Sequence, residues 1–221
     1  MTCALLKKTV WLLPVLMVLA AAGCNKEGRL AEAASQGDIE AQYELAIFYS
    51  EQEPAQKTKS YEWMKRAAAS RYTPAMKKLA EYYLTGYGTP VNYPRVADWL
   101  TRYYEYDRNS EDALAVGRKI LIGASSRADA IAGFLLFRIA LMLENQNGEG
   151  DSELAMAAGV ELITHAQKFF SWLLAARNYA DAGKILEFTD RMIKEYPQSF
   201  PDNSAVVIKK MYAEFNAHLE R

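Results

Sequence analysis

The apolar positions of the chain follow a helical period over most of its 221 residues. In the N-terminal half, the small and apolar side chains of Ala41, Leu45, Ala46 and Tyr49 recur at spacings of four, one and three, which places them on one helical face. The period returns beyond Asp151 and continues to a last helix predicted over residues 204–218. Strand-like runs are short and lie within this period. The pattern therefore predicts an all-α protein.

The pattern also repeats along the chain between about Leu30 and Leu100. A second copy follows the first at a shift of 34 residues, which grows to 36 at the tryptophans. The aligned pairs are Ala41 and Ala75, Leu45 and Leu79, Ala46 and Ala80, Tyr49 and Tyr83, and Trp63 and Trp99. A period of this length is the sequence signature of stacked helical hairpins.

The second copy contains a connection with defined turn chemistry. Gly86 and Gly88 permit positive backbone φ angles in a tight turn. Asn92 can accept hydrogen bonds from the first free amides of the next helix, and Pro94 suits the opening turn of that helix. Trp99 then buries a large apolar area within the hairpin. These residues predict two antiparallel helices joined by the turn.

These motifs resemble the Sel1-like repeat family, a helical-hairpin relative of the tetratricopeptide repeat. The resemblance rests on the helix over residues 75–83, the Gly86-x-Gly88 turn and the cap and tryptophan that follow. It implies a right-handed solenoid of antiparallel helical hairpins with irregular C-terminal helices. A third, degenerate copy is predicted at a shift of 37, with Gly117 at the small-residue position and Asp129 aligned with the capping Asn92.

The N-terminal segment has the layout of an export signal. Lys7-Lys8 precedes an apolar run over residues 9–22, too short to span a bilayer in the usual way, and small residues lead into Cys24. This resembles a bacterial lipoprotein signal peptide, which implies a mature chain that starts at Cys24 and is lipidated there. Asn25 follows the cysteine, and the resemblance then implies the periplasmic face of the outer membrane. An ordinary secretory signal peptide and an uncleaved anchor helix are the alternatives.

The predicted organisation has five segments. They are a lipoprotein signal peptide over 1–23, a short tether over 24–29, Sel1-like repeats over 30–108, a degenerate helical hairpin over 109–147, and a C-terminal helical region over 148–221 packed on the solenoid. An extended tether from Cys24 to Leu30 reaches at most about 18 Å. The helical domain is therefore expected to lie close to the membrane.

Cysteine and histidine usage narrows the chemistry. The cysteines are Cys3 and Cys24, so a mature chain that starts at Cys24 has no disulfide. With only His165 and His218 and no second soft ligand, a zinc site is not expected. The formal net charge of −1 becomes more negative when Lys7-Lys8 is removed, so binding to nucleic acid is not expected either.

No arrangement of residues in the sequence predicts catalysis. There is no nucleophile beside a base, no phosphate-binding glycine loop and no cluster of metal ligands. Gly86-Tyr87-Gly88 lacks the strand-to-helix context of a dinucleotide loop. His165 is interpreted as a partly exposed helical histidine. We therefore expect no enzyme activity, no catalytic residues, no metal and no cofactor.

Stacked helical hairpins offer an extended concave surface that suits a peptide or a protein. If the tetratricopeptide geometry carries over, as the resemblance implies, its lining residues lie at fixed offsets from Ala46, Ala80 and Gly117. The positions are Tyr43, Ile47, Ser50, Lys77, Glu81, Leu84, Leu114, Arg118 and Leu121. Partner binding is assigned to Tyr43, Ile47, Lys77, Glu81, Leu84 and Arg118, since aromatic and charged side chains make a recognition surface.

Signal segment and repeats together predict a lipid-anchored periplasmic adaptor. Its partner is expected to be a protein of an envelope assembly, secretion or polysaccharide-export system. The first alternative is a cell-wall or exopolysaccharide binding protein, in which Tyr87 and Tyr93 would stack on sugar. The second is a cell-wall hydrolase or lyase with a carboxylate pair or a base in a cleft.

Overall fold

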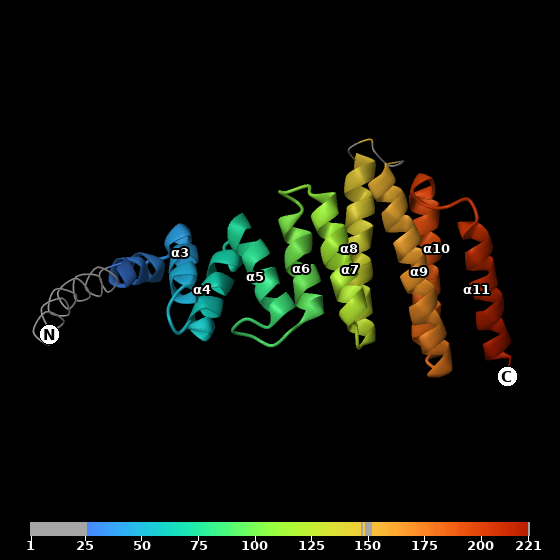
Figure 1. Cartoon of the computed structure of the whole chain (residues 1–221), viewed down its shortest axis with the longest axis horizontal. Helices are drawn as coiled ribbons and strands as arrows, with labels where there is room; N and C mark the ends of the chain where they lie inside the picture. The colour runs from blue at the N-terminus through green and yellow to red at the C-terminus, as the bar shows by residue number, and fades with distance from the viewer. Residues whose placement is uncertain (1–25, 147, 149–151, 221) are drawn as a thin grey trace, which may run out of the picture. The chain divides into compact units, whose positions relative to one another are not determined.

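The computed structural model describes residues 26–146, 148 and 152–220 (Figure 1). All regular elements in these ranges are helices, which confirms the all-α prediction. Residues 1–25, with the export signal and Cys24, lie outside the described part of the chain. None of the described helices is long and apolar enough to cross a membrane.

The chain divides into two compact units between Val91 and Asn92. The helices of the first unit are residues 26–35, α3 (Ile39–Ser50), α4 (Lys57–Ala69) and α5 (Thr73–Thr85). α4 packs against both α3 and α5, so the first copy of the repeat forms the predicted hairpin.

The second unit is larger and also entirely helical in its described part. Its elements are α6 (Tyr93–Tyr103), α7 (Ser110–Gly123), α8 (Arg127–Gln146), α9 (Glu153–Ala175), α10 (Tyr179–Glu195), the short 3₁₀ helix η1 (Pro197–Ser199) and α11 (Ser204–Leu219). α8 packs against α6, α7 and α9, and α10 packs against α9 and α11. The last helix therefore lies where the sequence predicts it. The right-handed course of the whole stack stays a prediction.

Small residues at the repeat positions allow the helices of the first unit to approach closely. Ala46 and Ala80 are buried, as are the neighbouring leucines of the same pattern. Ser60 on α4 donates a hydrogen bond to the Ala46 carbonyl oxygen at 2.7 Å and accepts one from the Tyr82 hydroxyl at 2.8 Å. The buried Ser60 hydroxyl thereby links α3, α4 and α5. It both donates and accepts a hydrogen bond, as is usual for a polar group that is buried.

The turn after α5 confirms the predicted glycine chemistry. Gly86 and Gly88 have φ angles of 76° and 67°. A Cβ atom at Gly88 would lie 2.3 Å from the carbonyl oxygen of Lys57, so this turn passes against the first residue of α4. Past the unit boundary, the Asn92 side chain accepts a hydrogen bond from the Arg95 amide at 3.0 Å and caps α6 as predicted.

Substituting Gly88 with alanine is expected to lower the free energy of unfolding by about 2 kcal/mol. The added Cβ meets backbone that cannot rotate away, and the positive φ strains any L side chain. Gly37→Ala is the matched control, because Gly37 has a φ of 95° but open space around its Cβ position. Urea unfolding should show a loss of only about 1 kcal/mol for the control. Equal losses in the two variants would contradict the close approach at Lys57.

α7 and α8 pack against each other where the third copy of the repeat is predicted, and the cap at the start of α8 differs from the predicted one. A Cβ at Gly117 would lie 2.9 Å from the Phe137 ring and 3.2 Å from the Gly133 carbonyl oxygen, which explains the small residue there. The alignment of Asp129 with Asn92 is wrong as a cap assignment. Ser126 occupies the position before α8, and its hydroxyl accepts from the Asp129 amide at 3.2 Å, while the Asp129 carboxylate accepts from the Ser126 amide at 3.0 Å.

Candidate functional site

Five of the six predicted partner-binding residues lie in the first unit, on two helices. Tyr43 and Ile47 are on α3, and Lys77, Glu81 and Leu84 are on α5. All five side chains are half-buried, so each combines contact with the core and access to solvent. We call these five residues the α3–α5 surface.

The aromatic part of this surface is Tyr43. Its ring lies 5.2 Å from the ring of Tyr72, centroid to centroid, which restricts its rotamers. Tyr43 and Ile47 also line a shallow pocket of about 360 Å³ together with Glu44 and Phe48. The aromatic ring and two apolar side chains therefore meet two carboxylates, of Glu44 and Glu51, and the ammonium group of Lys26 at one opening beside α3.

The charged part of the surface is on α5. Lys78 donates a hydrogen bond to the Glu81 carboxylate at 2.8 Å, and this bond is the main cause that raises the pKa of the Lys78 ammonium group. The Tyr43 ring on α3 lies against Tyr72, the residue directly before α5, so α3 and the start of α5 are neighbours at this surface. Glu81 therefore presents a carboxylate that already has a local cation beside it.

Arg118 is in the second unit, on α7, and is engaged with a neighbouring helix. Its guanidinium donates to the Glu161 carboxylate of α9 through Nε at 2.8 Å and Nη2 at 2.6 Å, which raises the guanidinium pKa. The related position Leu114 is only 2% exposed and belongs to the core. Of the three offsets from Gly117, Arg118 is thus ion-paired, Leu114 is buried and Leu121 lines a pocket of the second unit. We describe them apart from the α3–α5 surface.

The two tyrosines assigned to sugar stacking are both half-buried. In the first unit, the Tyr87 ring packs 4.6 Å from Tyr82, and its hydroxyl donates to the Ser50 carbonyl oxygen at 3.4 Å. Burial raises the pKa of Tyr87. Tyr93 begins α6 in the second unit, and its hydroxyl lies against the backbone of Gly123. Both rings are thus in contact with the fold around them.

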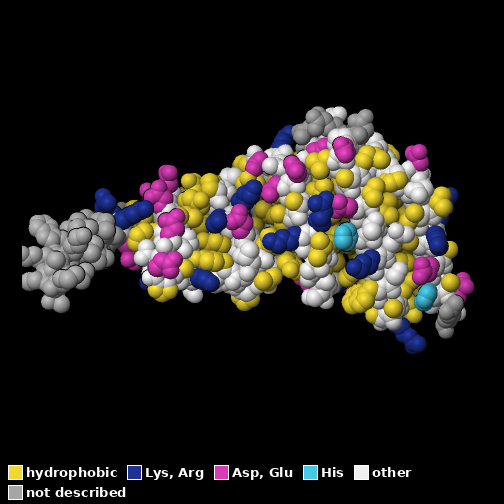
Figure 2. All heavy atoms as spheres, in the orientation of Figure 1, with side chains coloured by type: hydrophobic (Ala, Val, Ile, Leu, Met, Phe, Trp, Pro, Cys, Tyr) yellow, Lys and Arg dark blue, Asp and Glu magenta, His cyan; other side chains and the backbone are white. Residues whose placement is uncertain are grey.

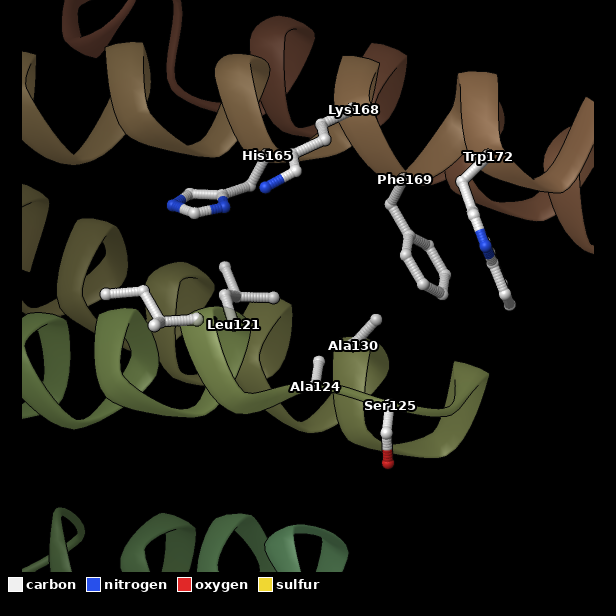
Figure 3. A pocket seen from close by; sticks show the side chains of 9 residues that line it. Leu121, Ala124, Ser125, Ala130, His165, Lys168, Phe169 and Trp172 are labelled. Carbon is white, nitrogen blue, oxygen red and sulfur yellow. The ribbon is translucent and has the colours of Figure 1, made fainter.

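The second unit contains a pocket of which the sequence predicted only one lining residue, Leu121. It has a volume of about 400 Å³ and lies between the C-terminal end of α7, the start of α8 and the C-terminal half of α9 (Figure 3). α9 contributes His165, Lys168, Phe169 and Trp172. Their spacing of three, one and three marks one helical stripe, and an exposed tryptophan within it is the signal that could have indicated the pocket.

The visible face of the molecule mixes apolar, basic and acidic side chains, and neither sign of charge dominates it (Figure 2). Among the described residues, no group of three or more histidine, cysteine, aspartate or glutamate side chains could hold a metal ion. Geometry of this kind suits recognition by shape and mixed contacts.

Fold and surfaces together define an all-α protein built from consecutive helical hairpins. No family profile matches the sequence, and no curated protein matches it. Among solved structures, the chain is similar to a protective antigen of uropathogenic Escherichia coli that displays an SLR (Sel1-like repeat) fold, with 15% sequence identity and a TM-score of 0.44. The match covers 86% of this chain but 40% of the antigen, so this chain spans less than half of that protein's length. A similarity this distant carries no argument about function.

Proposed function

We propose that this protein is a lipid-anchored periplasmic adaptor whose α3–α5 surface binds a partner protein. The partner belongs to an envelope assembly, secretion or polysaccharide-export system. The observation that carries the proposal is that half-buried aromatic, aliphatic and charged side chains lie on α3 and α5 of the first unit, and that Tyr43 on α3 contacts Tyr72 directly before α5. The binding role requires no metal and no cofactor.

The composition of the surface supports protein recognition. Interface centres favour aromatic anchors with aliphatic neighbours, while charged groups at the rim set specificity. Tyr43, with Phe48 and Ile47 beside it, supplies the anchor, and Glu81 supplies a rim charge. Because Tyr72 already restricts the Tyr43 ring, binding costs less side-chain entropy.

Lipid attachment is the second part of the proposal. It rests on the small residues before Cys24 and on the charged and apolar segments that precede them. Because the described helix already begins at residue 26, the tether is shorter than the extended reach of about 18 Å expected for residues 24–30, and the helical domain lies beside the bilayer. That position suits assistance to an outer-membrane channel, as in a pilotin-like role, better than reach across the periplasm.

A paired charge substitution tests the binding role. The double variant Lys77→Ala, Glu81→Ala is expected to reduce cross-linking to the partner protein in cells by about tenfold, since two rim contacts are removed. The variant should keep its helical circular dichroism spectrum, because both side chains are half-buried only. Lys209→Ala, Glu214→Ala is the matched control, with the same change of charge at two exposed positions of α11. Unchanged cross-linking in the test variant, or an equal loss in the control, would contradict the proposal.

Two further measurements separate the adaptor from the enzyme and from the polysaccharide-binding protein. A hydrolase or lyase would turn over a cell-wall substrate, and the double variant would abolish that turnover. A polysaccharide-binding protein would show perturbed tyrosine signals when purified protein is mixed with peptidoglycan fragments or secreted polysaccharide. Either result would replace the adaptor role.

A further inference from the structure

The pocket between α7 and α9 has chemically different ends. His165 and Lys168 lie side by side at one end, and Phe169 and Trp172 project toward Ala130 at the other (Figure 3). A site with a polar end and an apolar end favours an amphipathic ligand, which has one polar and one apolar end.

The apolar end presents an open aromatic surface. The Phe169 and Trp172 rings stack with centroids 5.3 Å apart and planes tilted by 25°. Trp172 is 53% exposed, and Ile122 at the end of α7 is 75% exposed. Large apolar side chains this exposed gain free energy when a ligand removes them from water.

The polar end carries a cation without a local counter-ion. Glu161 is already paired with Arg118, and the Asp129 carboxylate accepts hydrogen bonds from Ser125 and Ser126. No carboxylate among the described residues lies within ion-pairing distance of the Lys168 ammonium group. This end of the pocket therefore favours a negative charge on the ligand.

His165 completes the polar end as a neutral group. Burial is the main cause that lowers its pKa, and Lys168 and Arg118 add to that effect while Glu161 opposes it. A neutral imidazole can donate a hydrogen bond to a carboxylate. Ser125, in contrast, is engaged elsewhere, because its amide and hydroxyl both interact with the Asp129 carboxylate.

We propose that this pocket binds an amphipathic carboxylate, with the carboxyl group at Lys168 and His165 and an aromatic or large aliphatic body against Phe169 and Trp172. The volume of about 400 Å³ lies in the range of small-molecule sites and is too small for a folded segment. Such a group is found in free organic acids and at the C-terminal residue of a peptide. The site lies in the second unit and does not depend on the α3–α5 surface.

The test is a titration of the protein with small carboxylates, in which nuclear magnetic resonance monitors the two histidines. 3-(Indol-3-yl)propionate and its amide are added in parallel, together with an N-acetylated tripeptide that ends in a free phenylalanine. The acid should shift the His165 ring protons and raise the pKa of His165, because an added carboxylate favours the imidazolium form. His218 lies on α11 and serves as the internal control. The amide should bind about tenfold more weakly.

Two substitutions locate the ligand. Lys168→Gln should weaken binding of the acid about tenfold and leave the amide unaffected, whereas Lys209→Gln on α11 should change neither. Trp172→Ala should weaken both ligands and, as an exposed position, should not unfold the protein. If the indole acid binds more tightly than the tripeptide, the natural ligand of the pocket is a free organic acid. If the tripeptide binds more tightly, the natural ligand is the C-terminal residue of a peptide. Equal binding of acid and amide, an equal response to a neutral chitin oligosaccharide, or no response of His165 would overturn the proposal.

Discussion

Cys24→Ser is expected to move the protein from the membrane fraction to the soluble periplasmic extract almost completely. A serine hydroxyl cannot form the thioether through which the lipid is attached in the signal family that the sequence resembles. Two acyl chains hold a protein on a bilayer firmly, whereas none leaves only weak surface contacts. Cell fractionation followed by immunoblotting measures the change, and Asn25→Gln, at the neighbouring position, is the control.

Two other distributions would contradict lipid anchoring in different ways. A Cys24→Ser protein that stays in the membrane would indicate an uncleaved anchor helix. A wild-type protein that is already soluble would indicate an ordinary secretory signal peptide. Metabolic labelling with a fatty acid separates these cases, because only a lipidated Cys24 incorporates the label.

Gly159→Ala is expected to cause the largest loss of stability, about 3 kcal/mol in the free energy of unfolding. A Cβ atom at Gly159 on α9 would lie 1.8 Å from the carbonyl oxygen of Ser199, which belongs to η1. The backbone of η1 and the helix must separate to relieve the clash. This cost exceeds the roughly 1 kcal/mol that alanine gains over glycine inside a helix.

Gly183→Ala on α10 is the matched control for this prediction. Its Cβ would contact only the rim of the Phe215 ring, at 3.3 Å, and a side chain can move by a few tenths of an ångström. The control should therefore be neutral or slightly stabilising. Urea unfolding of the two variants measures the difference, and a Gly159→Ala protein as stable as the wild type would contradict the packing of η1 against α9.

Local sequence signals predicted the parts of the fold that depend on neighbours along the chain. Examples are the helical stripes, the positive φ angles of Gly86 and Gly88 and the cap at Asn92. Each depends on short-range sterics or hydrogen bonding, so the type of a single residue is enough to predict it. The alignment with Ala46 and Ala80 also predicts a small residue at Gly117, where the structure leaves no room for a Cβ atom.

Contacts between distant segments could not be predicted in the same way. Gly159 meets Ser199, and Arg118 pairs with Glu161, but nothing in the spacing of these residues indicates either contact. The cap of α8 was misassigned because a serine and an aspartate three positions apart exchange hydrogen bonds, so either could be aligned with Asn92.

The candidate sites differ in the same way between what local sequence predicts and what only the fold brings together. The residues of the α3–α5 surface followed from the offsets of the repeat, while the pocket on α9 requires the α7–α8 connection to lie against its exposed stripe. That connection is about 40 residues away from His165 in sequence. A pocket assembled from such separate segments becomes visible only in the folded protein.

Photo-cross-linking from single positions tests the central claim most directly. A photoreactive amino acid is placed at position 43, 47 or 84 on the α3–α5 surface, and at the exposed positions 62 and 65 of α4 as controls. The account predicts that all three test positions capture the same envelope protein, identified by mass, and that the α4 positions capture it at least tenfold less. Equal capture from α4, or no shared protein at the three test positions, would contradict an adaptor role for this surface.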